Sequence, residues 1–213
     1  MKALLIGATG ATGKELLQLI LKDESFHQLN IFVRSAPDFK HEKLKVHVID
    51  FDKSEEWKAL VTGDVLFSCL GTTLKAAGSK EAQWKIDYDY QYEFAKIAHE
   101  NEVPNYVLVS ASNASPDAFF FYSKMKGQLE EAVKALSFSK TIIFRPPTLI
   151  REDSKRIMEV VAVKVLGFLN KMGLFKSQKP ITTKVLAQAM LKTLKVLEKG
   201  QYTIKEQEIV KYK

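Results

Sequence analysis

Tyr122 and Lys126 are the two residues whose types and spacing point most directly to chemistry. They stand four positions apart in AFFFYSKMKGQL, residues 118–129, a run of aromatic, small and helix-forming residues. Residues at i and i+4 lie on one face of a helix, so the Lys126 ammonium can approach the Tyr122 phenol. A nearby ammonium stabilises a phenolate and lowers a tyrosine pKa from about 10 towards the working range of a general acid. The pair is therefore a candidate for proton transfer.

The spacing of this pair is not unique, because Tyr92 and Lys96 repeat it. Position separates the two pairs. Ser110 ends the strand predicted from YVLVS, and Tyr122 opens the helix that follows, so a hydroxyl, a phenol and an ammonium can converge on one substrate carbonyl. Tyr92 lies well inside a predicted helix, and Ser79, thirteen residues before it, falls in a predicted loop rather than at a strand end. We therefore predict Ser110, Tyr122 and Lys126 as the catalytic group.

A glycine-rich turn follows the first predicted strand in LLIGATGATGKELLQLIL, residues 4–21. Such a turn aims the amino end of the next helix at a pyrophosphate, and glycine removes the Cβ where backbone and phosphate approach each other. Thr9 and Thr12 add hydroxyl donors. The alternative is an ordinary strand-to-helix turn. We predict dinucleotide binding by the whole turn: Gly7, Ala8, Thr9, Gly10, Ala11, Thr12 and Gly13.

The end of the second predicted strand, IFVRS, carries Arg34 followed by Ser35. A protein that prefers NAD usually has an acid there, which accepts hydrogen bonds from the adenosine ribose. An arginine can instead pair with a 2′-phosphate and stack on adenine. We therefore predict NADP as the cofactor, with NADPH preferred over NADH; the alternative is a surface arginine at a strand end.

Two further strand ends are predicted to line the cofactor site. Asp50 and Phe51 close the third strand in VIDFD, where an acid can meet the adenine amino group beside an aromatic wall. Leu70, Gly71 and Thr72 close the fourth strand in SCLGTT, near the expected path of the nicotinamide-side ribose. Turn chemistry at a strand end is the alternative for both.

The elements that must position these residues alternate between strands and helices. Strands are predicted over residues 2–6, 30–33, 45–49, 65–68, 106–110 and 141–144, and helices over 13–22, 54–61, 81–101 and 122–136. This alternation predicts an α/β fold, a Rossmann-like doubly wound parallel sheet. Right-handed crossovers then place the carboxyl ends of the strands on one edge, where ligands bind.

The regular alternation of strands and helices ends after Arg145. We predict an apolar helix and loop over residues 155–175, an amphipathic helix over 183–198, and one or two short strands over 201–210. The apolar helix could dock a partner or a membrane, but a flap over the ligand edge is favoured. The chain is then a single domain, residues 1–213, with a Rossmann core over 1–149 and a small substrate-covering lobe over 150–213.

Composition limits the classes of function. The 213 residues carry a formal charge of +7, with lysines spread along the whole chain. No nucleic-acid motif accompanies this charge, so a generally basic surface is favoured over nucleic-acid binding. The four histidines are scattered without metal-ligand spacing, so we predict no metal site. Trp57, Trp84 and Phe119 to Phe121 are predicted as core or pocket wall.

The single cysteine, Cys69, excludes a disulfide within the chain and favours a reducing compartment. It is predicted as a small buried hydrophobe rather than a reactive thiol. No stretch reads as a signal peptide or is long and apolar enough to span a bilayer. We therefore predict a cytoplasmic protein with no membrane partner, leaving monomer or homodimer open.

Taken in order, GATGATG, VRS, SCLGTT, VSAS followed by YSKMKGQLE, and FRPPTLI resemble the short-chain dehydrogenase/reductase superfamily. The resemblance is closest to its atypical NAD(P)-binding members, the Tat-interacting-protein and NmrA-like group, and is clear over residues 1–150. It implies that Ser110 orients a carbonyl, that Tyr122 protonates the forming alkoxide, and that Lys126 binds the nicotinamide ribose and tunes Tyr122. It also implies nicotinamide contacts from the loop Pro146, Pro147 and Thr148.

Two departures from the family pattern stand out. Pro146 and Pro147 replace the more common Pro-Gly, and KIDYDYQY has Asp87 near the place of an asparagine that supports a proton relay in many members. The resemblance implies an NADP(H)-dependent oxidoreductase acting on a small carbonyl or alcohol. Two alternatives remain: a non-catalytic NADPH-binding sensor or scaffold, and a sugar-nucleotide epimerase or dehydratase, which the short tail disfavours.

Overall fold

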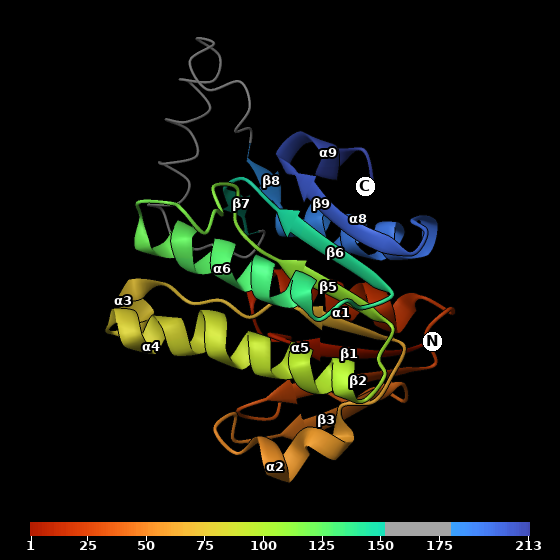
Figure 1. Ribbon diagram of the computed structural model, residues 1–213. Coiled ribbons are helices and arrows are strands. Elements are labelled where there is room, and N and C mark those ends of the chain that lie inside the picture. The colour runs from red at the N-terminus through yellow and green to blue at the C-terminus, as the bar shows by residue number, and fades with distance from the viewer. Residues whose placement is uncertain (152–179) are drawn as a thin grey trace.

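The computed structural model describes residues 1–151 and 180–213. Its centre is a seven-stranded parallel sheet in the order β3-β2-β1-β4-β5-β6-β9 (Figure 1). The strands are β1 (Lys2–Ile6), β2 (Gln28–Val33), β3 (Leu44–Val48), β4 (Val65–Ser68), β5 (Asn105–Val109), β6 (Lys140–Arg145) and β9 (Gly200–Lys205). Strand order reverses where β1 pairs with β4, and such a switch point opens a ligand crevice at the carboxyl edge. The predicted Rossmann-like sheet is confirmed.

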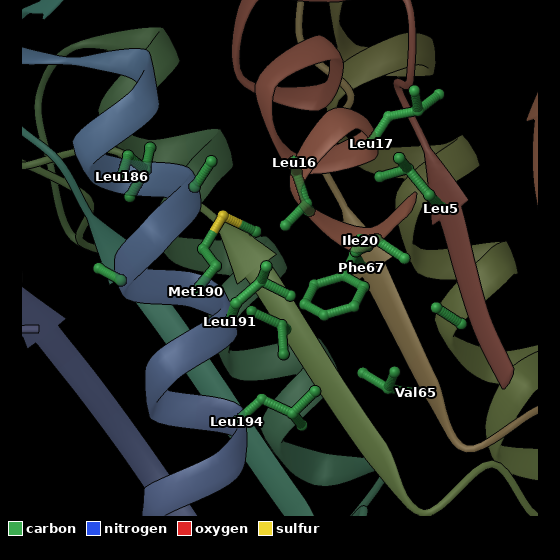
Figure 2. Close-up of a cluster of buried hydrophobic side chains, with 14 of the residues drawn as sticks. Leu5, Leu16, Leu17, Ile20, Val65, Phe67, Leu186, Met190, Leu191 and Leu194 are labelled. Atoms are coloured by element: carbon green, nitrogen blue, oxygen red, sulfur yellow. The ribbon is translucent and has the colours of Figure 1, made fainter. Parts of the chain in front are cut away.

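Helices cover both faces of the sheet because both sets of alternating strand side chains are apolar. Leu5 and Phe67 point towards α1 (Ala11–Lys22) and α8 (Thr183–Val196), where Leu16 and Met190 meet them in one buried cluster (Figure 2). The opposite face packs under α5 (Tyr90–Glu100) and α6 (Phe121–Ala135). Shorter segments on that side are α2 (Ser54–Trp57) and η1 (Lys58–Leu60).

The connection from β4 to β5 differs from the single helix predicted over residues 81–101. It contains α3 (Leu74–Ala77), α4 (Lys80–Trp84), a π-helical turn η2 (Lys85–Asp89), and then α5. A π-helical turn inserts extra chain into a helix and is found frequently at functional sites. The periodicity of the sequence does not reveal it, since the residues on either side are ordinary helix formers.

The C-terminal part also differs from its prediction. Strand β9 and helix α8 extend the main sheet and its helical layer, so Thr183–Lys205 do not form a separate lobe. Residues 206–210, predicted as strand, form the helix α9 (Glu206–Val210). A two-stranded parallel ladder, β7 (Leu149–Ile150) with β8 (Ile181–Thr182), stands apart from the main sheet. The helix predicted over 155–175 lies outside the described residues.

The aromatic residues divide into two groups. Trp57 is buried and stacks on Phe94 with ring centroids 4.3 Å apart, as predicted for a core residue. Phe119 and Phe120 are 94% and 74% exposed, so the prediction of core or pocket wall is wrong for them. They precede the first turn of α6, at the end of an irregular segment whose residues have no helical or strand periodicity to bury them.

Candidate functional site

The glycine turn is held tightly between β1, α1 and the end of β4. Gly7 has φ +81°, and a Cβ on it would lie 2.4 Å from the carbonyl of Cys69. A Cβ on Gly13 would lie 2.0 Å from the Gly7 carbonyl oxygen. Gly10 is the N-cap residue of α1, which has no side-chain cap and no acid in its first turn. Its amino-terminal N–H groups are therefore left for an anion at the switch point.

A cleft of about 180 Å³ opens beside this turn, at the carboxyl edge of the strands. Eight of its lining residues are among those predicted: Gly7, Thr9, Gly10, Arg34, Phe51, Leu70, Gly71 and Thr72. Three were not predicted as lining: Cys69, Ile86 and Tyr90. Tyr90 tilts against Phe51 with ring centroids 5.1 Å apart and forms the aromatic wall. Ile86 and Tyr90 are four residues apart on η2 and α5, a spacing that could have placed both on one face.

Other predicted binding residues lie outside this cleft. Asp50 is exposed; its carboxylate accepts the Asp52 N–H at 3.0 Å and its carbonyl accepts the Trp57 indole N–H at 2.8 Å, which is turn chemistry. Thr12 and Gly13 are buried in the start of α1, and Ser35 is exposed beyond Arg34. Ala8 and Ala11 line neighbouring hollows against α1.

Lys126 forms an ion pair with Asp87, with Nζ and Oδ1 3.1 Å apart. Both side chains are almost fully enclosed, at 2% and 0% exposure. The other Asp87 oxygen accepts the Thr72 N–H at 2.9 Å, so the carboxylate joins α6 to the wall of the cleft. Burial lowers the pKa of Lys126, while the charges of Asp87 and Glu130 oppose that shift. The lysine is therefore anchored at the predicted edge.

Ser110 follows β5 directly and belongs to a second buried network. Its hydroxyl donates to Glu130 Oε1 at 2.5 Å. Arg145, at the end of β6, donates to both oxygens of Glu130 at 2.5–3.1 Å. No hydrogen bond links Ser110 to Tyr122 or Lys126 within the described residues. The structure thus brings the three predicted catalytic residues to one edge of the sheet, but Ser110 and Lys126 belong to separate networks.

Tyr122 stands at the start of α6 and remains 40% exposed. Loss of water around its phenol, and then the negative charge of Asp87, raise the pKa of Tyr122 to about 12. The sequence predicted the opposite direction, from stabilisation of the phenolate by Lys126. The main reason is the loss of water around the phenol, to which the negative charge of Asp87 adds. Tyr122 is thus a protonated group throughout the neutral range.

The loop after β6 lies at the same edge without lining the cleft. Pro146 and Pro147 are buried, whereas Thr148 is exposed and its carbonyl accepts the Ile181 N–H at 3.2 Å. The loop therefore ties β6 to β8. Nicotinamide contacts from these three residues stay a prediction.

Sequence reasoning missed Glu130, Arg145 and Gly127. Glu130 comes four residues after Lys126, as Lys126 comes four after Tyr122, so the spacing could have placed all three on one face of α6. A Cβ on Gly127 would lie 2.1 Å from the Ser115 carbonyl carbon. This glycine lets the helix approach the loop that follows Ser110.

Cys69 packs against the core, and burial raises the pKa of its thiol to about 12. The thiol is therefore protonated and unreactive at neutral pH. Among residues 1–151 and 180–213, no cluster of histidine, cysteine or acidic side chains could hold a metal ion. No helix in the same part of the chain is long and apolar enough to cross a membrane.

A parallel sheet in this order, with a glycine turn at its switch point and a cleft at its carboxyl edge, defines a NAD(P)-binding Rossmann domain. The chain belongs to the NAD(P)H-binding family, whose model matches residues 7–195. Its relatives include protein FMP52-1, mitochondrial, of Scheffersomyces stipitis, 36% identical over 195 residues that cover 88% of this chain and 85% of that protein. Protein FMP52, mitochondrial, of Saccharomyces cerevisiae is 37% identical, over 71% of this chain and 67% of that protein.

Solved structures share the fold at low identity. A short-chain dehydrogenase/reductase superfamily protein from Agrobacterium tumefaciens with bound NAD has a TM-score of 0.73 and 11% identity, over 97% of this chain and 77% of that chain. MoeE5 in complex with UDP-glucose and NAD has a TM-score of 0.71 and 13% identity, over 96% and 75%. These likenesses confirm the predicted Rossmann-like fold. Both neighbours hold NAD, so they do not distinguish NAD from NADP for this chain.

The relatives contradict the predicted cytoplasmic location, because they are named as mitochondrial proteins. The prediction rested on a lone cysteine and on the lack of a recognisable signal peptide. Neither feature separates one reducing compartment from another.

Proposed function

We propose that this chain is an NADP(H)-dependent oxidoreductase that passes a hydride between the nicotinamide and a small carbonyl or alcohol. The observation that carries the proposal is the place of Lys126. Lys126 is anchored by Asp87, which lies directly behind Gly71 and Thr72 in the wall of the cleft, and Lys126 shares a helix face with Tyr122. A proton donor and a cation thus stand at the edge where the nicotinamide half would lie.

Each residue would have a separate role in the reduction. When bound, NADPH supplies the hydride to the carbonyl carbon. Tyr122 would give its phenolic proton to the carbonyl oxygen, and its pKa of about 12 keeps that proton in place at neutral pH. Lys126 would hold the nicotinamide-side ribose. Ser110, fixed by Glu130, would position the substrate oxygen.

Tyr122→Phe tests this function directly. We expect NADPH affinity to stay within about twofold, while reduction across a panel of small aldehydes and ketones falls at least about a hundredfold, since the proton donor is lost. Tyr92→Phe is the matched control, because Tyr92 has the same spacing to a lysine but lies on α5. Equal turnover by the Tyr122 variant and wild type would remove Tyr122 from the reaction.

The preference for NADP rests on Arg34, which is exposed and lines the cleft together with Phe51 and Tyr90. A guanidinium there can bind a 2′-phosphate and stack on adenine. We expect Arg34→Ala to weaken NADPH binding about tenfold and to leave NADH binding nearly unchanged. Lys96→Ala, on the exposed side of α5, is the control. An unaltered NADPH-to-NADH affinity ratio in the Arg34 variant would exclude this role.

One observation favours the second candidate, a non-catalytic NADPH-binding sensor. The Ser110 hydroxyl gives its proton to Glu130 and so has none to donate to a substrate carbonyl in this arrangement. Tight NADPH binding by the wild-type chain, with no oxidation of NADPH by any member of the carbonyl panel, would support the sensor and contradict the enzyme.

A further inference from the structure

Asp87 is a buried carboxylate directly beneath the wall of the cofactor cleft. A Cβ on Gly71 would lie 3.5 Å from Asp87 Oδ1, the oxygen that faces Lys126. The second oxygen accepts the Thr72 N–H. Gly71 and Thr72 line the cleft, so one residue layer separates this charge from the ligand space.

The backbone around Asp87 is fixed by buried amides. Gln91 donates to the Asp87 carbonyl oxygen at 2.7 Å and accepts the Ser68 hydroxyl proton at 2.7 Å. Gln83 donates to the Thr72 carbonyl oxygen at 3.2 Å. These bonds hold the π-helical turn against the end of β4, so the direction of the carboxylate is set before any ligand enters.

The charges that face Tyr122 come from several elements. Asp87 on η2 acts on the phenol, and Lys126 lies one turn along α6. Glu130, a further turn along, is neutralised by Arg145 from β6. On α4, Lys80 lies 5.6 Å from the ring centroid of the neighbouring Phe121. Of the two carboxylates named here, Glu130 is paired with an arginine, whereas Asp87 is paired only with Lys126.

We propose that Asp87 is a positioning residue that holds the Lys126 ammonium in place and opposes ionisation of the Tyr122 phenol, so that Tyr122 acts as the proton donor in carbonyl reduction. The last clause rests on the proposed oxidoreductase function. The position of the Asp87 charge beside Lys126 is observed independently of that function. An asparagine at residue 87 could still accept the Thr72 N–H, but it would supply no negative charge to Lys126 or Tyr122.

A purely structural role for Asp87 predicts a different titration of Tyr122 in the Asp87→Asn variant. If the carboxylate served only to fasten Thr72 and Lys126, its conversion to an amide would leave the ionisation of the phenol unchanged. If its charge acts on the phenol, the conversion lowers the pH at which Tyr122 ionises. Titration of Tyr122 therefore separates the two roles.

The experiment is a fluorine NMR titration of the full chain labelled with 3-fluorotyrosine, whose phenol is more acidic than that of tyrosine. The Tyr122 resonance is assigned by its loss in Tyr122→Phe. We expect Asp87→Asn to lower the midpoint of this resonance by about one pH unit. Asp89→Asn is the matched control, since Asp89 lies on the same turn, is exposed and bonds Trp84; its midpoint should equal that of wild type.

Two further variants keep the inference testable if Asp87→Asn folds poorly. Lys126→Met leaves the carboxylate unpaired and should not lower the midpoint, whereas the double variant Asp87→Asn, Lys126→Met removes both charges and should lower it. An unchanged or higher midpoint in whichever asparagine variant folds overturns the inference. The titration uses no substrate, so failure of the proposed reaction appears separately, as an absence of carbonyl reduction by the wild-type chain.

Discussion

Two carboxylates, Asp87 and Glu130, are completely buried on the same side of the sheet, yet they are neutralised differently. Glu130 receives three hydrogen bonds from Arg145 and one from Ser110. Asp87 receives one backbone N–H and lies beside one ammonium. The Glu130 carboxylate is saturated by groups of the fold, whereas the Asp87 carboxylate is balanced by a lysine that a ligand would also use.

This difference shows that burial alone does not distinguish a structural ion pair from a functional one. A buried carboxylate bound bidentately by arginine is a structural ion pair, which here connects α6 to β6. A buried carboxylate that is paired with a lysine and lies one residue layer from a cleft can shift the pKa of a neighbouring titratable group. Three substitutions test this contrast, in order of decreasing expected effect on stability, and a fourth experiment tests the wall of the cleft.

Removal of the Glu130 carboxylate should have the largest effect on stability. Glu130→Ala leaves Arg145 without its partner and opens a cavity, so we expect a loss of about 4 kcal/mol in the free energy of unfolding. Glu131→Ala is the control, because that neighbouring carboxylate is mostly exposed and pairs with Lys134. Urea denaturation measures the stability of both variants. A loss no larger than that of the control would contradict a structural role for the Glu130–Arg145 ion pair.

Asp87→Asn should cost less, about 2 kcal/mol near pH 7, because Lys126 can lose its proton instead of remaining a buried unpaired charge. The folded pKa of Lys126 then lies further below its ordinary value of 10.5 than in wild type. Between these two pKa values the unfolded chain binds more protons, so stability rises with pH. Urea midpoints at about pH 7 and about pH 9.5 should therefore differ more in the variant than in wild type. Equal pH dependence would show that Asp87 does not control the charge on Lys126.

Ser110→Ala should have a smaller effect on stability. Glu130 keeps its three bonds from Arg145, so we expect a loss of about 1.5 kcal/mol for the single charge-assisted bond removed. Ser112→Ala, two residues further along the same loop, should cost less than about 0.5 kcal/mol. Thermal melts of the three proteins give the comparison, and equal costs for the two serines would mean that the bond to Glu130 adds no stability.

A separate prediction concerns Cys69, an ionisable residue that lines the cleft. Burial raises the pKa of its thiol to about 12, so almost no thiolate exists near neutral pH. We expect the native chain to react with iodoacetamide at pH 8 at least about a hundredfold more slowly than the urea-unfolded chain. Similar rates would mean that the cleft wall opens readily.

Much of this fold could be predicted from the sequence. Runs of β-branched and apolar residues marked β1 and β4 at their observed bounds, because strands buried on both faces read as continuous apolar segments. The π-helical turn could not be predicted, since its residues have ordinary helix propensity and its geometry is set by contacts of Gln91 and Asp87. Strand β9 was similarly placed in a lobe, because its pairing with β6 depends on contacts about 60 residues apart.

The candidate site was only partly predictable. The glycine turn and the strand ends were found because local geometry dictates their residue types. The separation of Ser110 from Lys126 was not found, because spacing along a helix shows which residues share a face but not which partner each one selects. Asp87 was noticed as a departure from a family pattern, yet its contact with Lys126 and its effect on Tyr122 depend on packing between η2 and α6.

The most direct test of the account is a crystal structure of the chain with NADP. We expect the pyrophosphate at the amino end of α1, the 2′-phosphate at Arg34, and the Tyr122 phenol oxygen within about 6 Å of the nicotinamide C4, a gap that one carbonyl group can bridge. A phenol beyond that reach, or a nicotinamide bound away from α6, would contradict the central claim that Tyr122 and Lys126 form a catalytic pair.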